Sequence, residues 1–463
     1  MQTSDWQINN SGQQRRAVIV GAGPAGTLMA LYLAQMHWQV SVYERRDSYE
    51  QWVSNGGGVN QSGRSYNIVL TERALFAFKQ AGVDLPPEQS VLLQGNVRHI
   101  NKGIQFHRQL GQSISINRNV LAMHLTQEGN KRFPDKIAYK FGYTLSRVLF
   151  DQKIAFFDSD SGSVEQPFDL LVGADGVFSS VRAAMIEHFD GISCQQHKDD
   201  MMLKVCLIEK ATELPNAQSN WDKCFHTWPS YQPVSILASP NPDGSLTGIF
   251  IMPPEGEMSF EKLKNEEDVQ ALFKNKFPDI FGDRPLPESW AKSLLEQKAS
   301  YGGITTICSA LDGGDCAVLI GDSGHSVWAS LGQGCNVALE SCRVLAETLA
   351  THNGNLSQAL PAYTSDRKLD VDAIARMSEQ GFGGNKRVGN AMFFAKLIVL
   401  SLLNKVLPNL VNKPAIVQIA RADVRYSESP ENYSDFTCRI IQIFTSIKLR
   451  SITSSFDSIS SKP

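Results

Sequence analysis

The sequence predicts an α/β fold in which a parallel sheet covered by helices is interrupted by an antiparallel sheet and followed by a helical region. Residues 17–44 have the pattern of a strand, a glycine turn, a helix and a second strand. Short β-type runs separated by turns fill residues 201–301, and a buried strand followed by a long helix comes after residue 302. The first and third patterns are typical of parallel sheets and the second of antiparallel ones, so we expect two kinds of sheet.

The first element is a glycine-rich turn. The apolar run Ala17–Val20 precedes the segment GAGPAG at 21–26, and the Ala/Leu-rich stretch 27–35 follows it. Such glycines let the backbone turn sharply and approach a pyrophosphate at a helix N-terminus, where free N–H groups favour an anion. The turn therefore predicts a Rossmann-like dinucleotide-binding domain of the GxGxxG type. The expected contacts are Gly21, Gly23, Ala25 and Gly26.

The second strand, 40–43, ends at Glu44, about 20 residues after the glycines. A carboxylate there can accept hydrogen bonds from a ribose hydroxyl and would repel a 2′-phosphate. We therefore expect FAD or NAD rather than NADP as the resident dinucleotide, with Arg45 beside it. The alternative is that Glu44 is an ordinary charge at a strand end.

Two later segments, GADG and the GD motif with its GQG turn, indicate that this dinucleotide is a flavin. GADG at 173–176 lies mid-chain, Gly321-Asp322 (GD) follows the apolar strand 317–320, and GQG at 332–334 precedes the helix 335–349. An acidic side chain at the end of a strand can reach ribityl and ribose hydroxyls, and the positive end of a helix dipole stabilises an anionic reduced flavin. The three motifs together predict bound FAD. The expected contacts are Asp175, Gly176, Asp322, Gly332, Gln333, Gly334, Cys335 and Asn336.

The remaining patterns divide the chain. A strand at 65–70, a helix at 72–81 and a helix from about 117 belong to the first domain. We expect a flexible N-terminus (1–16), an FAD-binding domain in two parts (17–200 and 302–350), an inserted antiparallel-sheet substrate domain (201–301), a C-terminal helical region (351–430) and a tail (431–463) that is Ser-rich and disordered at its end.

Composition argues against several functions. The net charge of −3 argues against nucleic acid as the main partner. The eight cysteines contain no CxxC pair, so we expect neither a metal site nor a disulfide framework, and a reduced, cytoplasmic setting is the default. A single glycine fingerprint leaves no second nucleotide domain. NADPH or NADH is therefore expected to visit only transiently.

One apolar stretch, 391–407, raises the question of membrane contact. Lys396 and Lys405 interrupt it, and it is shorter than a comfortable membrane span. We expect a packed or surface-lying helix, with association at the periphery of a membrane as the alternative.

The motifs, in this order and spacing, resemble the group A FAD-dependent aromatic hydroxylases, the family of p-hydroxybenzoate hydroxylase, and within it the kynurenine 3-monooxygenases. The resemblance covers about 15–430. The segments that carry it are 63–70, 115–118, 226–229, 277–279, 321–325 and 423–426.

The resemblance implies that NAD(P)H reduces FAD, that O2 adds at flavin C4a, and that the resulting hydroperoxide transfers one oxygen atom to an aromatic ring. No protein nucleophile is needed, so no side chain is expected to be catalytic. By position, Glu44, Arg118 and Asp322 match the family's FAD contacts, and 175–176 matches its shared FAD/NAD(P)H motif. Arg64, in one of the resembling segments, is also expected to contact FAD.

Four positions depart from the kynurenine pattern. Asn96, Phe106, Gly381 and Ile416 stand where the family holds the amino-acid carboxylate. Losing one charge-assisted pair costs about 1.5–3 kcal/mol, so several losses would abolish recognition of a small zwitterion. If the alignment shifts, Arg98 or Arg108 could restore the contact. We therefore expect a larger or less polar aromatic substrate, with authentic kynurenine 3-hydroxylation as the alternative.

A further departure lies before the GQG turn, where 329–331 reads Ala-Ser-Leu instead of Pro-Phe-Phe and follows Trp328. This change would reshape the pocket above the flavin. A flavoprotein oxidase or dehydrogenase and a non-catalytic flavin-binding protein remain rival functions. The expected substrate-pocket residues are Asn96, Arg98, Phe106, Arg108, Trp328 and Ser330.

Overall fold

The computed structural model describes residues 14–54, 66–100, 103–109, 111–208, 210–229, 234–282, 284–380 and 418–428. Arg64, Gly381, Ile416, the apolar stretch 391–407 and the Ser-rich tail lie outside the described residues. Among the described helices, none is both long and apolar enough to cross a bilayer.

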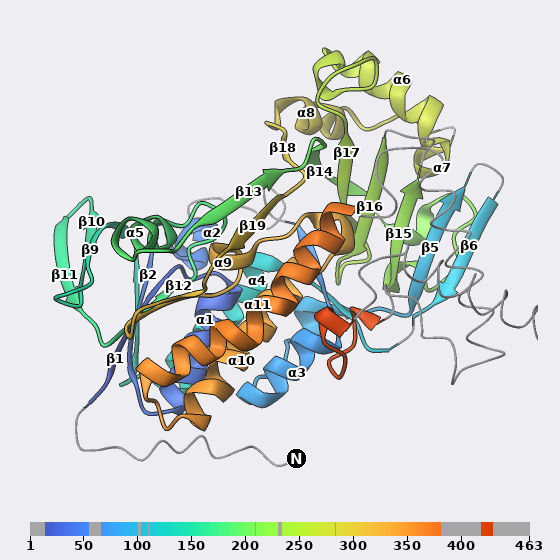
Figure 1. The fold of residues 1–463 in the computed structure, drawn as a ribbon. Coiled ribbons are helices and arrows are strands. Elements are labelled where there is room, and N and C mark those ends of the chain that lie inside the picture. The colour runs from blue at the N-terminus through green and yellow to red at the C-terminus, as the bar shows by residue number, and fades with distance from the viewer. Residues whose placement is uncertain are drawn as a thin grey trace, which may run out of the picture.

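A six-stranded sheet forms the centre of the first domain (Figure 1). Five strands are parallel, and the short strand β20 pairs antiparallel at one edge. Strand β21, from late in the chain, pairs with β12, so the two parts of the predicted FAD-binding domain share one sheet. The strands, in spatial order, are β20 (Asp312–Gly313), β21 (Ala317–Leu319), β12 (Leu170–Gly173), β1 (Arg16–Val20), β2 (Gln39–Glu44) and β8 (Ile137–Phe141).

Helices pack closely beside this sheet. Helix α1 (Pro24–Gln35) is buried from Gly26 to Ala34, because it contacts the sheet as well as α4 (Arg118–Arg132) and α10 (Gly334–Thr351). Pro24 in its first turn costs no helical hydrogen bond, since the first N–H groups of a helix have no partner within it. Helix α10 also packs against α3 (Glu72–Ala81) and α11 (Leu356–Gln380).

A seven-stranded sheet forms the second domain. It is antiparallel except where β15 pairs with β5. The sequence analysis confined this sheet to 201–301, but it also includes β5 and β6 from within the 17–200 segment, because β5 pairs with β15, more than a hundred residues later, and β6 pairs with β5. The strands, in spatial order, are β18 (Ser300–Tyr301), β14 (Met202–Ile208), β17 (Leu246–Met252), β16 (Ser235–Pro240), β15 (Cys224–Pro229), β5 (Gly95–Ile100) and β6 (Gly103–Arg108).

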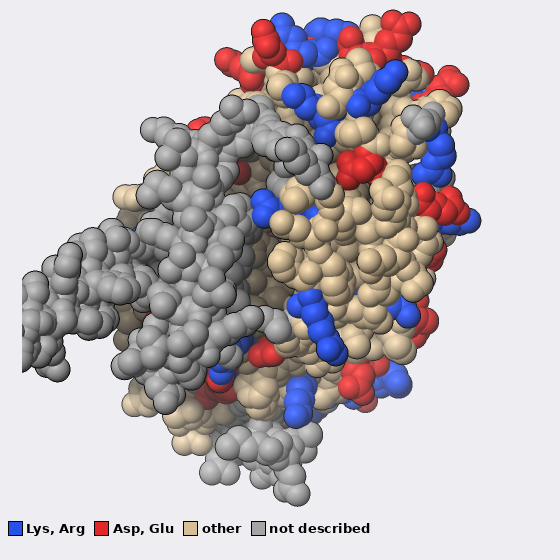
Figure 2. All heavy atoms as spheres, turned by 90° about the vertical axis from the view of Figure 1, so that its right-hand side faces the viewer, with Lys and Arg blue, Asp and Glu red and all other residues tan. Residues whose placement is uncertain are grey.

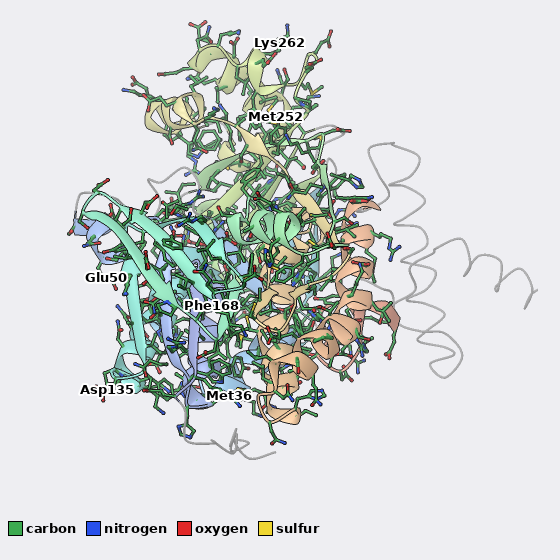
Figure 3. All side chains as sticks on the ribbon, turned by 60° about the vertical axis from the view of Figure 1, so that its left-hand side comes forward. Met36, Glu50, Asp135, Phe168, Met252 and Lys262 are labelled. Atoms are coloured by element: carbon green, nitrogen blue, oxygen red, sulfur yellow. The ribbon has the colours of Figure 1, made fainter. Side chains whose placement is uncertain are left out.

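Each domain has its own hydrophobic core. Met36 and Phe168 are buried in the first core and Met252 in the second (Figure 3). The second core lies between one face of the seven-stranded sheet and the helices α6 (Glu266–Lys276), α7 (Pro278–Phe281) and α8 (Glu288–Glu296). The other face of that sheet is left uncovered by these helices.

Smaller sheets complete the fold. They are a sheet of β3 (Asn67–Leu70), β7 (Ile114–Asn117) and β4 (Ser90–Leu92), a meander of β9 (Thr144–Leu149), β10 (Ile154–Ser159) and β11 (Gly162–Pro167), and a ribbon of β13 (Cys194–Lys198) with β19 (Ile304–Cys308). The short helices α2 (Tyr49–Ser54) and α5 (Ser180–His188) lie between strands along the chain, and the short helix α9 (Asp322–His325) follows β21.

Candidate functional site

The predicted cofactor motifs meet at one edge of the six-stranded sheet. Parallel strands have their carboxyl ends at the same edge, and ligands of such sheets bind there. Gly21 follows β1, Glu44 ends β2, Ala174 follows β12, and Gly321 lies just beyond β21. The tertiary structure therefore brings together segments that are up to three hundred residues apart.

The glycine turn is tight on one side and open on the other. Gly21 has φ +105°, and a Cβ atom there would lie 2.3 Å from the carbonyl oxygen of Ala174. A Cβ atom on Gly26 would lie 1.9 Å from the carbonyl oxygen of Gly21, so neither position accepts a side chain. Gly23 has no atom within 4 Å of such a position, and α1 has no side-chain cap. The open N-terminus of α1 fits the pyrophosphate of FAD.

Glu44 stabilises this turn directly. Its carboxylate accepts hydrogen bonds from the backbone N–H of Ala22 at 2.9 Å and of Arg46 at 3.1 Å. Arg45, the next residue, is exposed. Glu44 therefore has a structural role in addition to the ribose contact that the sequence predicts.

Asp175 caps a helix. Its carboxylate accepts hydrogen bonds from the hydroxyl of Ser179 at 2.5 Å and from the backbone N–H of Ser180 at 2.7 Å, at the start of α5. Burial raises the pKa of Asp175, and these bonds act in the opposite direction. Gly176 has φ +84° and open space around it, so the backbone after Asp175 is accessible to a ligand.

Arg182 connects two of the motifs and was not predicted. Its guanidinium donates to the carbonyl of Ser323 at 2.6 Å and to that of Val177 at 2.8 Å. A buried arginine that bonds only backbone carbonyls has no signature in a single sequence. This contact fixes the distance between the DG and GD segments.

Asp322 and Arg118 lie close enough to influence one another. The side chain of Asp322 is solvent-exposed, yet the protein around it partly desolvates the carboxyl and raises its pKa, whereas the positive charge of Arg118 lowers that pKa. For Arg118 burial lowers the pKa, but Tyr66 and Asp322 outweigh burial and raise it above its ordinary value. Burial also raises the pKa of Cys335 to about 12, so this residue stays a thiol. An acidic group, a basic group and a thiol therefore surround the start of α10.

The GQG turn before α10 has open space at Gly332 and is held in place by hydrogen bonds from Asn336. Gly332 has φ +63° with no atom within 4 Å of a Cβ position, and α10 has no side-chain cap. Asn336 is buried and holds the turn, because its amide bonds Gly332, Val69 and Thr71 at 2.8–3.1 Å. Asn336 thus positions the turn, whereas the N–H groups of 333–335 are available to a cofactor.

The predicted substrate-pocket residues on β5 and β6 point to two different faces. On β5, Val97 is buried against the second core, whereas Asn96 and Arg98 alternate with it and are half-buried. Phe106 pairs with Val97, and directly paired residues share a face. Arg108 is two residues after Phe106 in β6, so its side chain lies on the same face as Phe106. The structure therefore brings Asn96 and Arg98 together but separates them from Phe106 and Arg108.

Phe106 and Arg108 belong to the outer strand of the sheet. The Phe106 ring lies over Gly95, where a Cβ atom would be 2.4 Å from it, and Phe106 remains 42% exposed. Figure 2 shows this side of the molecule, on which charged side chains gather toward α6 and the rim while the middle is mostly uncharged. These two residues line the outer edge rather than the face with Asn96.

Trp328 and Ser330 lie directly before the GQG turn. The indole N–H of Trp328 donates to the carbonyl of His197 in β13 at 3.1 Å, and the Ser330 hydroxyl donates to the carbonyl of Ser378 in α11 at 2.6 Å. The segment 328–330 is therefore anchored to both the ribbon and α11, directly before the GQG turn.

Comparison with known proteins identifies the family. The chain is 32% identical over 411 residues to a kynurenine 3-monooxygenase of Xanthomonas campestris pv. campestris (strain 8004), which covers 83% of both chains. It is 30% identical over 379 residues to that of Legionella pneumophila (strain Corby), covering 80% of both. The chain belongs to the kynurenine 3-monooxygenase family. No model of a known protein family matches it.

Solved structures agree on the fold. A mutant of 2-methyl-3-hydroxypyridine-5-carboxylic acid oxygenase superposes with a TM-score of 0.62 at 19% identity, over 88% of this chain and 97% of that one. PqsL from Pseudomonas aeruginosa, described as a probable FAD-dependent monooxygenase, superposes with a TM-score of 0.58 at 15% identity, over 83% and 100%. The predicted fold class is confirmed. As a member of the kynurenine 3-monooxygenase family, the chain is an FAD-dependent monooxygenase with a nicotinamide reductant.

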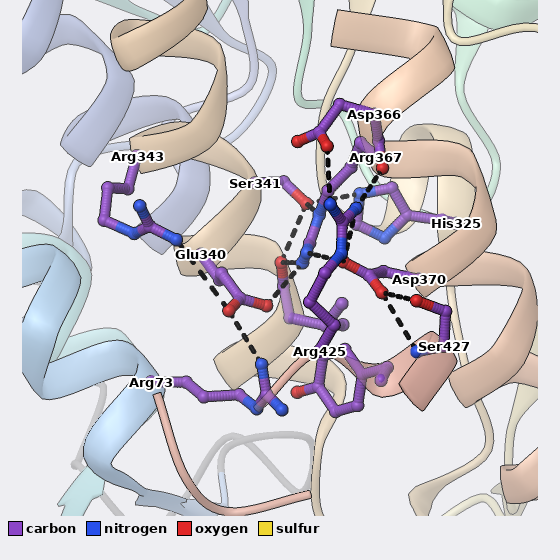
Figure 4. Close-up of polar contacts among 12 residues, drawn as sticks. Arg73, His325, Glu340, Ser341, Arg343, Asp366, Arg367, Asp370, Arg425 and Ser427 are labelled. Atoms are coloured by element: carbon purple, nitrogen blue, oxygen red, sulfur yellow. Dashed lines mark hydrogen bonds and ion pairs between the residues drawn. The ribbon is translucent and has the colours of Figure 1, made fainter. Parts of the chain in front are cut away.

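A buried network of charged residues links α10 to α3 and α11 (Figure 4). Glu340 on α10 pairs with Arg73 on α3 and with Arg367 on α11, each at 2.8 Å. Burial raises the pKa of Glu340, but Arg367 and Arg73 outweigh burial, so the pKa lies below its ordinary value. Asp370 extends the network to Arg425 at 3.1 Å. The sequence did not predict these ion pairs.

His325, in the GDSGH segment, has a structural role inside the core. It is buried, and its Nε2 atom lies 3.0 Å from the Ser341 hydroxyl. Burial, together with the positive charge of Arg367, lowers its pKa to about 3. It therefore stays neutral in the folded protein at physiological pH.

Acid is expected to destabilise the protein partly through His325. The unfolded chain binds a proton on this residue below about pH 6.5, but the folded chain does so only near pH 3, so stability is full above 6.5 and falls between these values. We expect His325→Asn to show a smaller drop in melting temperature between pH 7.5 and pH 5 than the wild type. An equal drop in both proteins would contradict this account.

Glu44→Ala is expected to weaken FAD binding by about fivefold, because the variant loses a ribose acceptor and the bond to the Ala22 N–H. Titration of the apoprotein with FAD, followed by flavin fluorescence, measures the effect. Glu44→Gln, which keeps an acceptor for Ala22, is the control and should lose less. Equal FAD affinity in Glu44→Ala and the wild type would exclude the ribose contact.

Proposed function

We propose that the protein hydroxylates an aromatic small molecule that is larger or less polar than kynurenine, using FAD, O2 and NADPH or NADH. The observation that supports this proposal is the distribution of apolar and polar side chains on the uncovered face of the seven-stranded sheet. Alternate residues of its strands are half-buried there, opposite the core that α6, α7 and α8 cover. The proposal concerns the substrate and the site, within the monooxygenase class.

Most of that face is apolar. Leu237 on β16 pairs with Ile249 on β17, which in turn pairs with Val205 on β14. On the other side Leu237 pairs with Thr227 on β15, and Phe225 is two residues away on the same face. Because these residues share one face and are only half-buried, they form a continuous apolar wall suited to an aromatic ring.

The polar side chains of the face lie at its β5 end. The Asn96 amide donates to Gln109 at 3.2 Å, so part of its hydrogen-bonding capacity is already used. Arg98 brings a positive charge, and burial lowers its pKa. A substrate with a ring over the apolar wall and an acceptor or anionic group toward Arg98 would match this distribution. A zwitterionic amino acid would also need a partner for its ammonium group.

The chain's residues have binding and positioning roles in the reaction. When bound, FAD supplies the oxygen-transfer chemistry. The glycine turn would hold its pyrophosphate, Asp322 and Glu44 its hydroxyl groups, and the N-terminus of α10 the charge of the reduced ring. Trp328 and Ser330, anchored to β13 and α11, would exclude water from the flavin turn.

The test is turnover of the FAD-loaded protein with NADPH and O2, with L-kynurenine and a panel of larger aromatic acids and ketones as substrates. Mass spectrometry of the products reports the gain of one oxygen atom. Hydroxylation of a panel compound but not of kynurenine is the expected result. Efficient formation of 3-hydroxykynurenine would overturn the substrate proposal.

Two rival functions have their own signatures in the same assay. Reduction of the flavin followed by peroxide release, with no hydroxylated product from any compound, would identify an oxidase or dehydrogenase. A flavin that NADPH and NADH both fail to reduce, with every compound present, would identify a non-catalytic flavin-binding protein.

A further inference from the structure

A C-terminal segment returns to the start of the flavin helix. Residues 418–428 lie beside α11 and α3, far along the chain from α10. Within this segment the hydroxyl of Tyr426 donates a hydrogen bond to the Oε1 atom of Gln333 at 3.1 Å. Tyr426 is completely buried and Gln333 is 4% exposed, so water does not compete for this bond.

Arg73 fixes the position of the tyrosine ring. Its guanidinium carbon lies 3.7 Å from the centre of the Tyr426 ring. The same guanidinium donates to the backbone carbonyls of Ile419 and Val424, so it holds the segment on both sides. Its remaining bond, to Glu340 at 2.8 Å, ties this arrangement to α10. The tyrosine is therefore held at a defined place relative to the flavin helix.

Gln333 is the residue immediately before α10, in the GQG turn. Among the described residues, its side chain makes one hydrogen bond, to Tyr426. Because the amide oxygen faces the tyrosine hydroxyl, the amide NH2 is the donor that is left for a ligand. The orientation of this amide, and of the turn that carries it, therefore depends on Tyr426.

We propose that Tyr426 is a positioning residue of the flavin site, which acts through Gln333 to hold the GQG turn in the conformation that receives the isoalloxazine ring. The inference rests on the FAD site proposed above. A precisely placed donor stabilises charge on a reduced flavin without reorganisation, whereas a loose one does not. Tyr426 is expected to tune both FAD affinity and the flavin's reduction potential.

The test compares Tyr426→Phe with Tyr363→Phe. Tyr363, on α11, is equally buried and also near Arg367, but it makes no contact with Gln333, so it controls for the loss of a buried hydroxyl. We expect Tyr426→Phe to raise the FAD dissociation constant about fivefold, to make the flavin reduction potential more negative, and to shift the flavin absorbance. Tyr363→Phe is expected to change none of these.

A double-mutant cycle with Gln333→Ala separates the positioning role from general destabilisation. If Tyr426 acts through Gln333, Tyr426→Phe should have no further effect on FAD affinity or potential in the Gln333→Ala background. Additive effects would overturn the proposal, and so would a Tyr426→Phe variant with wild-type affinity and potential. If Tyr426→Phe does not fold, Gln333→Ala with unchanged potential overturns it instead.

The outcome for the wild type distinguishes this inference from the proposal on which it rests. Wild-type protein that fails to bind FAD would overturn the flavin site as a whole. Wild-type protein that binds FAD, with Tyr426→Phe indistinguishable from it, would overturn only the positioning role.

Discussion

Asp322→Ala is expected to fold and to lose bound FAD, with an FAD dissociation constant raised about 10- to 100-fold. The Asp322 carboxylate lies at the carboxyl end of the sheet beside Arg118, where it would accept hydrogen bonds from the cofactor's hydroxyl groups. Loss of a charged acceptor costs about 1.5–3 kcal/mol, which corresponds to that range. FAD occupancy of the purified variant, measured from its flavin absorbance, and titration of the apoprotein give the result.

Asp315→Ala is the matched control for this experiment. Asp315 is only a few residues earlier in the chain, but its carboxylate pairs with Lys153 on the surface, where both side chains are well exposed. Surface pairs contribute little, so FAD occupancy should stay at the wild-type value. Asp322→Ala with full FAD occupancy would remove this residue from the cofactor site.

Glu340→Ala is expected to lower the free energy of unfolding by about 3–5 kcal/mol, because it leaves the buried charges of Arg73 and Arg367 without their partner. The midpoint of chemical denaturation, followed by tryptophan fluorescence in the absence of FAD, measures this loss. Since Arg73 also holds the C-terminal segment, that segment should become more sensitive to proteolysis in the variant.

Glu347→Ala is the control for Glu340→Ala on the same helix. Glu347 pairs with Arg343, but its side chain is 41% exposed. Exposed pairs of this kind contribute less than about 1 kcal/mol, so the denaturation midpoint should move little. Equal losses in the two variants would contradict the assignment of the network as a structural element.

The cofactor motifs show how much of this structure can be predicted from the sequence. The glycine turn, the acidic end of β2 and the GQG turn before α10 are local, because each depends on residues within a few positions of one another. The structure places the glycine turn, the end of β2 and the Gly321-Asp322 segment at one sheet edge, as parallel strands require. The family assignment is confirmed by relatives of about 30% identity.

The substrate face could not be predicted in the same way. Asn96 and Phe106 looked like members of one pocket, but the register of β5 and β6 assigns them to opposite faces. A hairpin's register depends on the turn and on the core that the strand covers, and a shift of one residue would exchange the faces. Neither factor is visible in the residues themselves.

The sequence by itself determined the class of cofactor and the family, because turn chemistry and helix starts are encoded by neighbouring residues. Only the tertiary structure decided which strands form the substrate sheet, which face Asn96 and Arg98 share, and that Glu340 lies between Arg73 and Arg367. It also decided that Tyr426 contacts Gln333, more than ninety positions earlier. Pairings between distant segments depend on how the helices and sheets pack, and local residue preferences carry no record of that packing.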